Sequence, residues 1–244
     1  MLSDIPYQLS TAADLSLTVH TPWIFHGGYA VLEALRVRAS REGRSLQISP
    51  PAFGEVIGFN CVGRGGGGTI PLRHFEHLDP STIGEFLMSE WAQRARHLSE
   101  LQHEEMLDSV GEIFVNAFRH AKSDVGVIAC GQYYPANGAL HLSVVDLGIG
   151  IPRSLANASG CREDDIEPMR ALAWAFEPGH SSIRAARGHG LAILRDFLRA
   201  QHAKLHVFSG RGYARLVGAH WEVRALAQRF PGTLIDIELP TTGY

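Results

Sequence analysis

Nine residues near the middle of the chain give the clearest indication of its fold: Glu112-Ile113-Phe114-Val115-Asn116-Ala117-Phe118-Arg119-His120. Side chains four residues apart lie on one face of an α-helix, so Glu112, Asn116 and His120 would form a polar row with Arg119 beside it. An adjoining face has apolar residues at helical spacing, which a helix buries against a core: Met106, Val110, Ile113, Ala117 and Ala121. Taken alone, the polar row is more typical of a solvated helix face than of a functional site.

The composition of the 244-residue chain is that of a globular protein, with 45% hydrophobic and 19% charged residues. The net charge of -3, with both signs mixed along the chain, excludes a basic field, so we expect neither nucleic acid nor a membrane as partner. There is no apolar run of about eighteen residues and no leader pattern. The three cysteines are far apart and form no Cys-x-x-Cys pair, which favours a reducing cytoplasm.

Residues 1–90 are expected to form a small α/β domain. Strand-like and helical patterns alternate there, at residues 14–20, 28–42, 45–49 and 51–60. The glycine run at 63–68 lacks the Gly-Lys-Ser/Thr of a P-loop, so a hairpin or linker turn is favoured over a phosphate cradle. We place the domain boundary near residues 80 to 95, and residues 91–244 form the second domain.

The second domain is predicted to be an α/β sandwich, a mixed and mainly antiparallel sheet with helices on one face. The Asn-Gly pair at 137–138 predicts a hairpin between β-rich runs at 125–134 and 140–146. Residues 153–187 are loop-rich, with a short helix at 167–176, and are long enough to form a lid. One more helix and four strands follow, at residues 188–203, 204–209, 213–217, 221–226 and 233–239.

Three separated motifs have to be explained together. They are Glu112-x-x-x-Asn116, Asp146-x-Gly148-x-Gly150 and Gly188-x-Gly190. Each alone is weak, because Asp-x-Gly-x-Gly is common in turns and Gly-x-Gly is common at the entry to a helix. Their order, with a hairpin between the first two and a lid between the last two, is hard to obtain by chance.

With these motifs in this order, the chain resembles the histidine-kinase-like ATPase superfamily, which includes histidine kinases, anti-sigma serine kinases and gyrase. These proteins bind ATP in a Bergerat fold, and the resemblance covers residues 100–240. Residues 112–120 look like the N box, 146–152 like the first glycine box and 188–191 like the second. The phenylalanine box and the closing strand of histidine kinases also have similar counterparts, at residues 175–180, 231–234 and 238–240.

The resemblance implies how the base would be recognised. Asp146 would accept a hydrogen bond from the adenine amino group. Gly148 and Gly150 would let the backbone approach the nucleotide where a Cβ would intrude, and Ile151 belongs to the same loop. Thr233 of the closing strand would lie near the adenine and bond through its hydroxyl or a water.

The resemblance also implies how the phosphates would be held. Asn116 offers an amide oxygen, a hard ligand suited to Mg²⁺. Arg119 and His120 would supply positive or donor groups to the phosphate chain. The second glycine box, Gly188-His189-Gly190-Leu191, ends in a helix N-terminus whose free amides favour phosphate oxygens. The implied cofactors are therefore ATP and Mg²⁺.

Glu112 permits catalysis without choosing the reaction. In gyrase-like relatives the matching Glu is the general base that activates water, whereas in kinases a Glu there is compatible with phosphotransfer. The chain is therefore interpreted as an ATPase or a protein kinase in signalling. The alternative is a nucleotide-gated interaction module, in which ATP closes the lid and changes a partner surface with little turnover.

Partners are harder to predict from the sequence. His103 is not followed by the Pro of a phosphoacceptor box, and it lies too close to Glu112 to leave room for a dimerising hairpin. A phosphate acceptor on a protein partner, either a Ser/Thr hydroxyl or an external His, is still compatible with the sequence. A homodimer is compatible with it as well. Residues 1–90 faintly resemble the STAS-like modules that partner anti-sigma kinases, and a structural or docking domain of another kind is the alternative.

Overall fold

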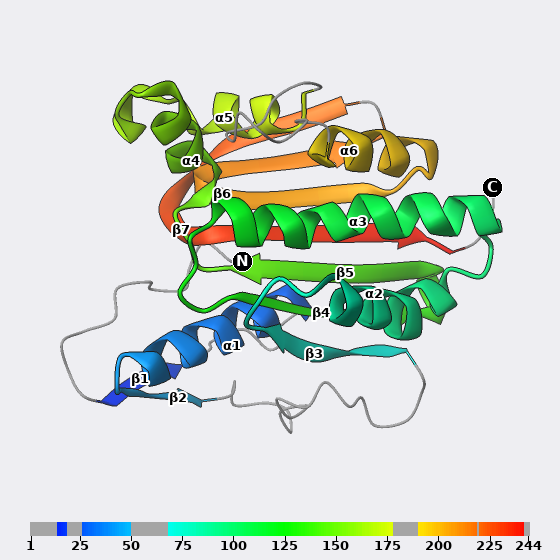
Figure 1. Ribbon diagram of the computed structural model, residues 1–244, viewed down its shortest axis with the longest axis horizontal. Coiled ribbons are helices and arrows are strands. Elements are labelled where there is room, and N and C mark those ends of the chain that lie inside the picture. Colours follow the sequence, from blue (N-terminus) through cyan, green and yellow to red (C-terminus); the bar gives the residue numbers. More distant parts are fainter. Residues whose placement is uncertain (1–13, 19–25, 50–67, 178–189, 219, 242–244) are drawn as a thin grey trace.

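A five-stranded sheet forms the centre of the computed structural model, which describes residues 14–18, 26–49, 68–177, 190–218 and 220–241 (Figure 1). Its strands are β3 (Thr69–Phe75), β4 (Val127–Tyr134), β5 (Ala139–Asp146), β6 (Lys204–Val217) and β7 (His220–Pro240). They lie in the order β3-β4-β5-β7-β6, and every neighbouring pair is antiparallel. A separate parallel pair is formed by β1 (Asp14–Thr18) and β2 (Ser45–Ser49).

Six α-helices accompany the described strands: α1 (His26–Arg41), α2 (Pro80–Phe86), α3 (Glu100–His120), α4 (Gly150–Ser159), α5 (Pro168–Ala175) and α6 (Gly190–Ala200). Shorter helical turns occupy Leu87–Trp91, Ala92–Arg94, Pro135–Asn137 and Glu163–Asp165. In Figure 1, α3 runs lengthwise along the sheet with α2 and α6 to either side of it. None of the described helices is long and apolar enough to cross a membrane.

The face of the sheet under α3 holds the larger core. Leu140, Leu142 and Val144 alternate along β5 and point to this face, as the two-residue period of a strand requires. Helix α3 adds the fully buried Phe114, and its start is fixed by a capping box between Ser99 and Gln102. Each of these features is local in the sequence, so the position of α3 follows from hydrophobic period and capping.

The opposite face is covered by α1. Its small buried residues Ala30 and Ala34 pack against Cys130 of β4 and Val145 of β5. Small side chains let a helix approach a sheet closely, and Phe230 of β7 fills another part of the same core. The N-terminal helix therefore packs directly on the central sheet.

Several sequence predictions are confirmed. The α/β sandwich is present, the hairpin joins β4 to β5, and strands and a helix lie at 14–18, 26–41 and 45–49. The helix expected at 51–60 and most of the 63–68 glycine run lie outside the described residues. The division of the chain near residue 90 stays a prediction, although β3 precedes it and pairs with β4.

Other expectations need correction. Residues 153–187 were expected to be loop-rich, but α4 occupies 150–159, because Gly150 and Gly160 delimit a ten-residue amphipathic segment. The four short C-terminal strands are two long ones, since β6 and β7 pair with a register shift near Gly210 instead of breaking. The helices of residues 91–244 were expected on one face of the sheet, and α1, which comes from the region before them, covers the other face.

Candidate functional site

The polar row predicted on the N box lies on the last part of α3. Glu112 and Asn116 are half-buried, Arg119 is exposed and His120 is half-buried. Burial, followed by the nearby charge of Arg119, lowers the pKa of His120, so this imidazole stays neutral at pH 7. No described residue forms a hydrogen bond or ion pair with the side chain of Glu112 or Asn116, so both are available to a ligand.

The first glycine box is in direct contact with the end of α3. The backbone amide of Ile149 donates to the carbonyl of Ala121 at 2.7 Å. A Cβ added to Gly148 would lie 2.0 Å from that same carbonyl oxygen, which no side chain could tolerate. Gly148 is therefore explained by the close approach of its loop to the end of α3. The same contact brings the first glycine box next to the N box.

Asp146 ends β5 and is almost fully buried, with 4% of its surface exposed. Its Oδ1 accepts a hydrogen bond from the amide of Gly148 at 2.8 Å, and the amide of Thr233 also donates to the carboxylate. Burial raises the pKa of Asp146 to about 7, although these two amides and the charge of Arg38 act in the opposite direction. The carboxylate is therefore poised between its two protonation states near neutral pH.

A hydroxyl network that the sequence did not indicate fixes the start of α4. The Ser209 hydroxyl donates to the carbonyl of Gly232 at 3.0 Å and accepts from the amide of Ile151 at 2.8 Å. Since Ser209 has one proton to give, the hydroxyl of Thr233, 3.0 Å away, acts as the donor in the third contact. Thr233 is thus tied to Ser209, a strand residue that no motif marks.

A close approach of β7 to the first glycine box explains a second glycine. Gly232 has a φ of +117°, and a Cβ there would lie 2.2 Å from the carbonyl oxygen of Asp146. In the sequence, residues 231–234 resembled the closing strand of histidine kinases, and they lie within β7. The closing strand therefore supports the Asp146 loop through backbone contact.

Helix α1 supports the same loop from the other side of the sheet. The guanidinium of Arg38 donates to the carbonyl of Leu147 and pairs with Asp124 at 3.3 Å. Arg41 of the same helix donates to the carbonyl of Asp124. These residues were not predicted because they come from a region expected to be a separate domain.

The second glycine box is only partly described. Gly188 and His189 lie outside the described residues, while Gly190 begins α6 and Leu191 packs partly buried against the main core. Phe176, from the phenylalanine box, is fully buried and its carbonyl accepts a hydrogen bond from Arg195 at 2.8 Å. Residues 178–180 of that box lie outside the described residues as well.

The site therefore gathers at one end of the sheet, where α3 ends, β5 ends and α4 begins (Figure 1). The sequence of residues 82–205, more than half of the chain, matches the histidine kinase-like ATPase domain family. The chain belongs to this family, and the matched segment contains the N box and both glycine boxes. A comparison with curated proteins gives no significant match.

Proposed function

We propose that the protein binds Mg-ATP at the end of the sheet where α3, the first glycine box and α4 meet. The observation that carries this proposal is the environment of Asp146, a buried carboxylate served by backbone amides alone. An amino group from adenine would supply a further donor and favour the charged form of the carboxylate. Adenine is thus the ligand whose chemistry best fits this acceptor.

Magnesium would accompany the nucleotide, and Asn116 is the described side chain that fits it. Its amide oxygen is a hard donor, it is half-buried, and no described residue occupies it. Bound magnesium would neutralise charge on the phosphate oxygens. Asn116 lies one helical turn after Glu112, so the ion and the proposed base would share one face of α3.

The remaining phosphate contacts are proposed for residues near the two helix ends. Arg119 keeps its charge at any physiological pH, whereas His120 is neutral and would form an ordinary hydrogen bond. Residues 188–191 lead into α6, where Gly190 and Leu191 contribute backbone amides at the start of the helix. Together they would hold the triphosphate between α3 and α6, which pack side by side.

For the reaction we propose that Glu112 acts as a general base. In hydrolysis it would take a proton from the water that attacks the γ-phosphorus, while the bond to the β,γ-bridging oxygen breaks and ADP leaves. In phosphotransfer a Ser/Thr hydroxyl or an external imidazole would replace that water. The role in signalling, the acceptor and the partner stay predictions.

Binding is tested by calorimetric titration of ATP in magnesium buffer. Asp146→Asn removes the anionic acceptor and is expected to weaken ATP binding at least tenfold, because charge-assisted hydrogen bonds contribute about 1.5–3 kcal/mol. Asp196→Asn, at an exposed carboxylate on α6, is the matched control and should bind like the wild type. Equal affinity of the Asp146 variant and the wild type would refute the proposed adenine site.

Catalysis is tested by ADP release with Glu112→Gln. Loss of a general base is expected to lower the rate about 100-fold or more while ATP affinity stays within a few-fold. Glu105→Gln, an exposed position on the same helix, serves as the control. If wild type binds ATP tightly but neither releases ADP nor labels an added acceptor protein, the nucleotide-gated interaction module replaces the enzyme.

A further inference from the structure

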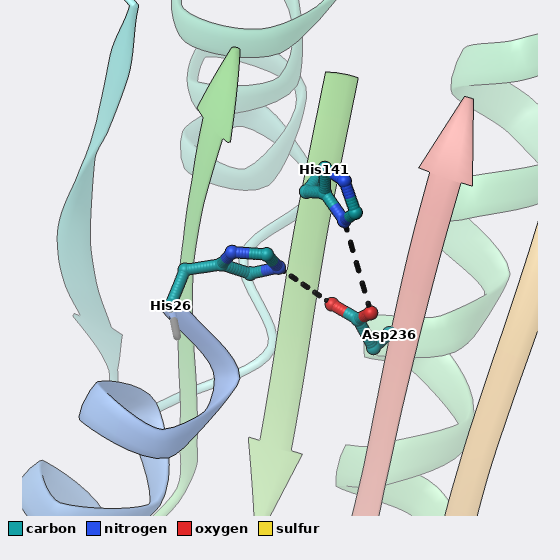
Figure 2. A group of neighbouring side chains, drawn as sticks. All are labelled: His26, His141 and Asp236. Carbon is teal, nitrogen blue, oxygen red and sulfur yellow. Dashed lines mark hydrogen bonds and ion pairs between the residues drawn. The ribbon is translucent and has the colours of Figure 1, made fainter. Parts of the chain in front are cut away.

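A second polar cluster lies on the α1 face of the sheet, opposite the proposed nucleotide site. It joins His26 at the start of α1, His141 on β5 and Asp236 on β7 (Figure 2). Nε2 of His26 lies 2.8 Å from Oδ1 of Asp236, and Nδ1 of His141 lies 4.0 Å from Oδ2. One ligand atom from each residue lies within 4.8 Å of the other two, so the three converge on a common point.

The hydrogen bonds of the cluster leave one side of Asp236 incomplete. Ser143 donates to Oδ1 at 2.6 Å, the same oxygen that contacts His26, and this holds the carboxylate in place. The 4.0 Å gap between Oδ2 and His141 is too long for a hydrogen bond, and Nδ1 of His141 is buried without a hydrogen-bond partner. Leaving such an atom unpaired is costly, which indicates a missing group between them.

The electrostatics of Asp236 favour its charged form. Burial alone raises the pKa of Asp236, but the imidazoles of His141 and His26 and the hydroxyl of Ser143 outweigh it and hold the pKa well below its usual range. A buried carboxylate of this kind needs a positive partner. A bound metal ion would supply that charge.

We propose that His26, His141 and Asp236 bind a divalent transition-metal ion, with Zn²⁺ as the best fit. Two imidazole nitrogens and a carboxylate oxygen are a ligand set that zinc accepts, whereas magnesium prefers oxygen ligands only. In a tetrahedral site with bonds of about 2.0 Å, neighbouring ligand atoms are about 3.3 Å apart. The two observed distances from a histidine nitrogen to an Asp236 oxygen, 2.8 and 4.0 Å, lie on either side of this value. Small rotations of the side chains would therefore be enough to form the site.

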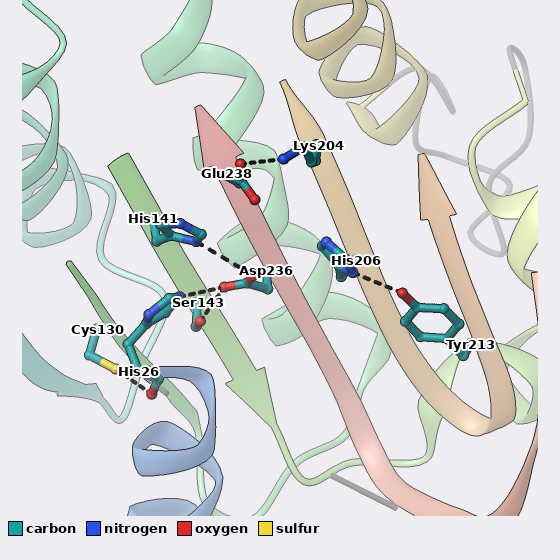
Figure 3. Close-up of polar contacts among 9 residues, drawn as sticks. All are labelled: His26, Cys130, His141, Ser143, Lys204, His206, Tyr213, Asp236 and Glu238. Atoms are coloured by element: carbon teal, nitrogen blue, oxygen red, sulfur yellow. Dashed lines mark hydrogen bonds and ion pairs between the residues drawn. The ribbon is translucent and has the colours of Figure 1, made fainter. Parts of the chain in front are cut away.

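The ion would tie the N-terminal helix to two strands that are distant in sequence. His141 keeps 17% of its side chain exposed, which leaves a route for the ion and a position for water. Figure 3 shows the wider polar surroundings, in which His206 lies 2.9 Å from the hydroxyl of Tyr213. His206 is outside the group of three and offers a matched control histidine on the same face.

The test uses the full chain, stripped of metal with a chelator and titrated with Co²⁺, whose visible absorption reports tetrahedral nitrogen and oxygen ligands. We expect one equivalent to bind, Zn²⁺ to displace it, and the melting temperature to rise with metal. His141→Gln should weaken binding at least tenfold, and Asp236→Asn should do the same. His206→Gln should bind like the wild type.

Each outcome decides the proposal independently of nucleotide binding. His141→Gln removes a partly exposed side chain, so it reports on the site even if Asp236→Asn does not fold. Absence of a cobalt spectrum in the wild type, or a spectrum unchanged in His141→Gln, would overturn the metal site and leave a hydrogen-bonded cluster without a metal. ATP titrations on the same stripped samples separate a failure here from a failure of the proposed function.

Discussion

Asp146 and Asp236 are two buried aspartates on neighbouring strands, yet their surroundings are opposite. Asp146 belongs to the α3 face, and backbone amides are its hydrogen-bond donors, so burial dominates and its pKa is raised to about 7. Asp236 belongs to the α1 face, where two imidazoles and a hydroxyl lower its pKa. The side chains around Asp236 thus favour its charged form in the folded chain itself, whereas the backbone amides around Asp146 do not outweigh its burial.

The two aspartates also differ in what their strands support. The Asp146 loop is stabilised by close backbone contacts at Gly148 and Gly232, which leave no space for side chains. The Asp236 cluster is built from side chains that meet across three elements. The first arrangement favours a fixed loop around a ligand, and the second favours a cross-link between α1 and the sheet.

The largest effect is expected for Asp236→Asn in metal-free buffer. The buried carboxylate is lost together with its contacts to His26 and Ser143, which should lower the free energy of unfolding by about 3–5 kcal/mol at pH 7. Because its folded pKa is depressed, the stability from ionised Asp236 is present above about pH 4 and is lost on further acidification, so the difference should shrink there. Urea unfolding at several pH values measures it, and an equally stable variant would contradict the contrast.

Asp146 should show the opposite pH dependence in the nucleotide-free protein. Its raised pKa makes the folded state bind more protons than the unfolded state, so this stability is full below about pH 4 and is lost as pH rises through about 7. Between pH 5 and pH 8 the loss should be about 3 kcal/mol. The Asp146→Asn variant should lack this pH-dependent loss of stability. If urea unfolding showed the same change of stability with pH for wild type and variant, the raised pKa of Asp146 would be refuted.

Gly148→Ala should separate a steric effect from a helix-propensity effect. The added Cβ would collide with the Ala121 carbonyl, so a loss of about 2 kcal/mol is expected. Gly111→Ala is the control inside α3, where an added Cβ would meet nothing within 4 Å, and it should gain about 0.5–1 kcal/mol. Thermal unfolding of both variants gives the signs, and a neutral Gly148 variant would show that the loop can move away.

Nucleotide affinity should depend on the protonation of Asp146. If adenine requires the carboxylate, the binding constant at pH 6 should be about tenfold lower than at pH 8, with a proton released on binding. Calorimetry in buffers of different ionisation enthalpy measures both quantities. The ATP phosphates titrate in the same way whether ATP is added to the wild type or to Asp146→Asn. If the binding constant of the variant changed with pH as strongly as that of the wild type, Asp146 would not be the cause.

The smallest effect is expected for Arg38→Gln, which tests the link between the two faces. Loss of the hydrogen bond to Leu147 and of the half-exposed pair with Asp124 should cost about 1 kcal/mol. Arg36→Gln, on the same helix and paired with Glu33, is a control that does not contact the loop. ATP binding should weaken only for Arg38→Gln, and equal changes in both variants would show a general effect on α1.

Sequence patterns were sufficient to predict the features that depend on residues close together in the chain. Hydrophobic period located α3, Asn-Gly located the β4–β5 hairpin, and the spacing of Asp146, Gly148 and Gly150 indicated the loop proposed to bind the nucleotide. The family followed because those motifs occur in a fixed order. These signals come from residues close together in the sequence, so they can be recognised without knowledge of the tertiary contacts.

Contacts between residues that are distant in the sequence could not be predicted and became visible in the folded chain. Helix α1 lies on the far face of the sheet, which brings His26 to Asp236, 210 positions away, and Arg38 to Leu147. Ser209 likewise joins the Asp146 loop through a strand pairing that carries no motif. A single histidine, serine or arginine forms no recognisable sequence pattern. Its role here depends on which strands and helices pack together, and neighbouring strands of this sheet are far apart in the chain.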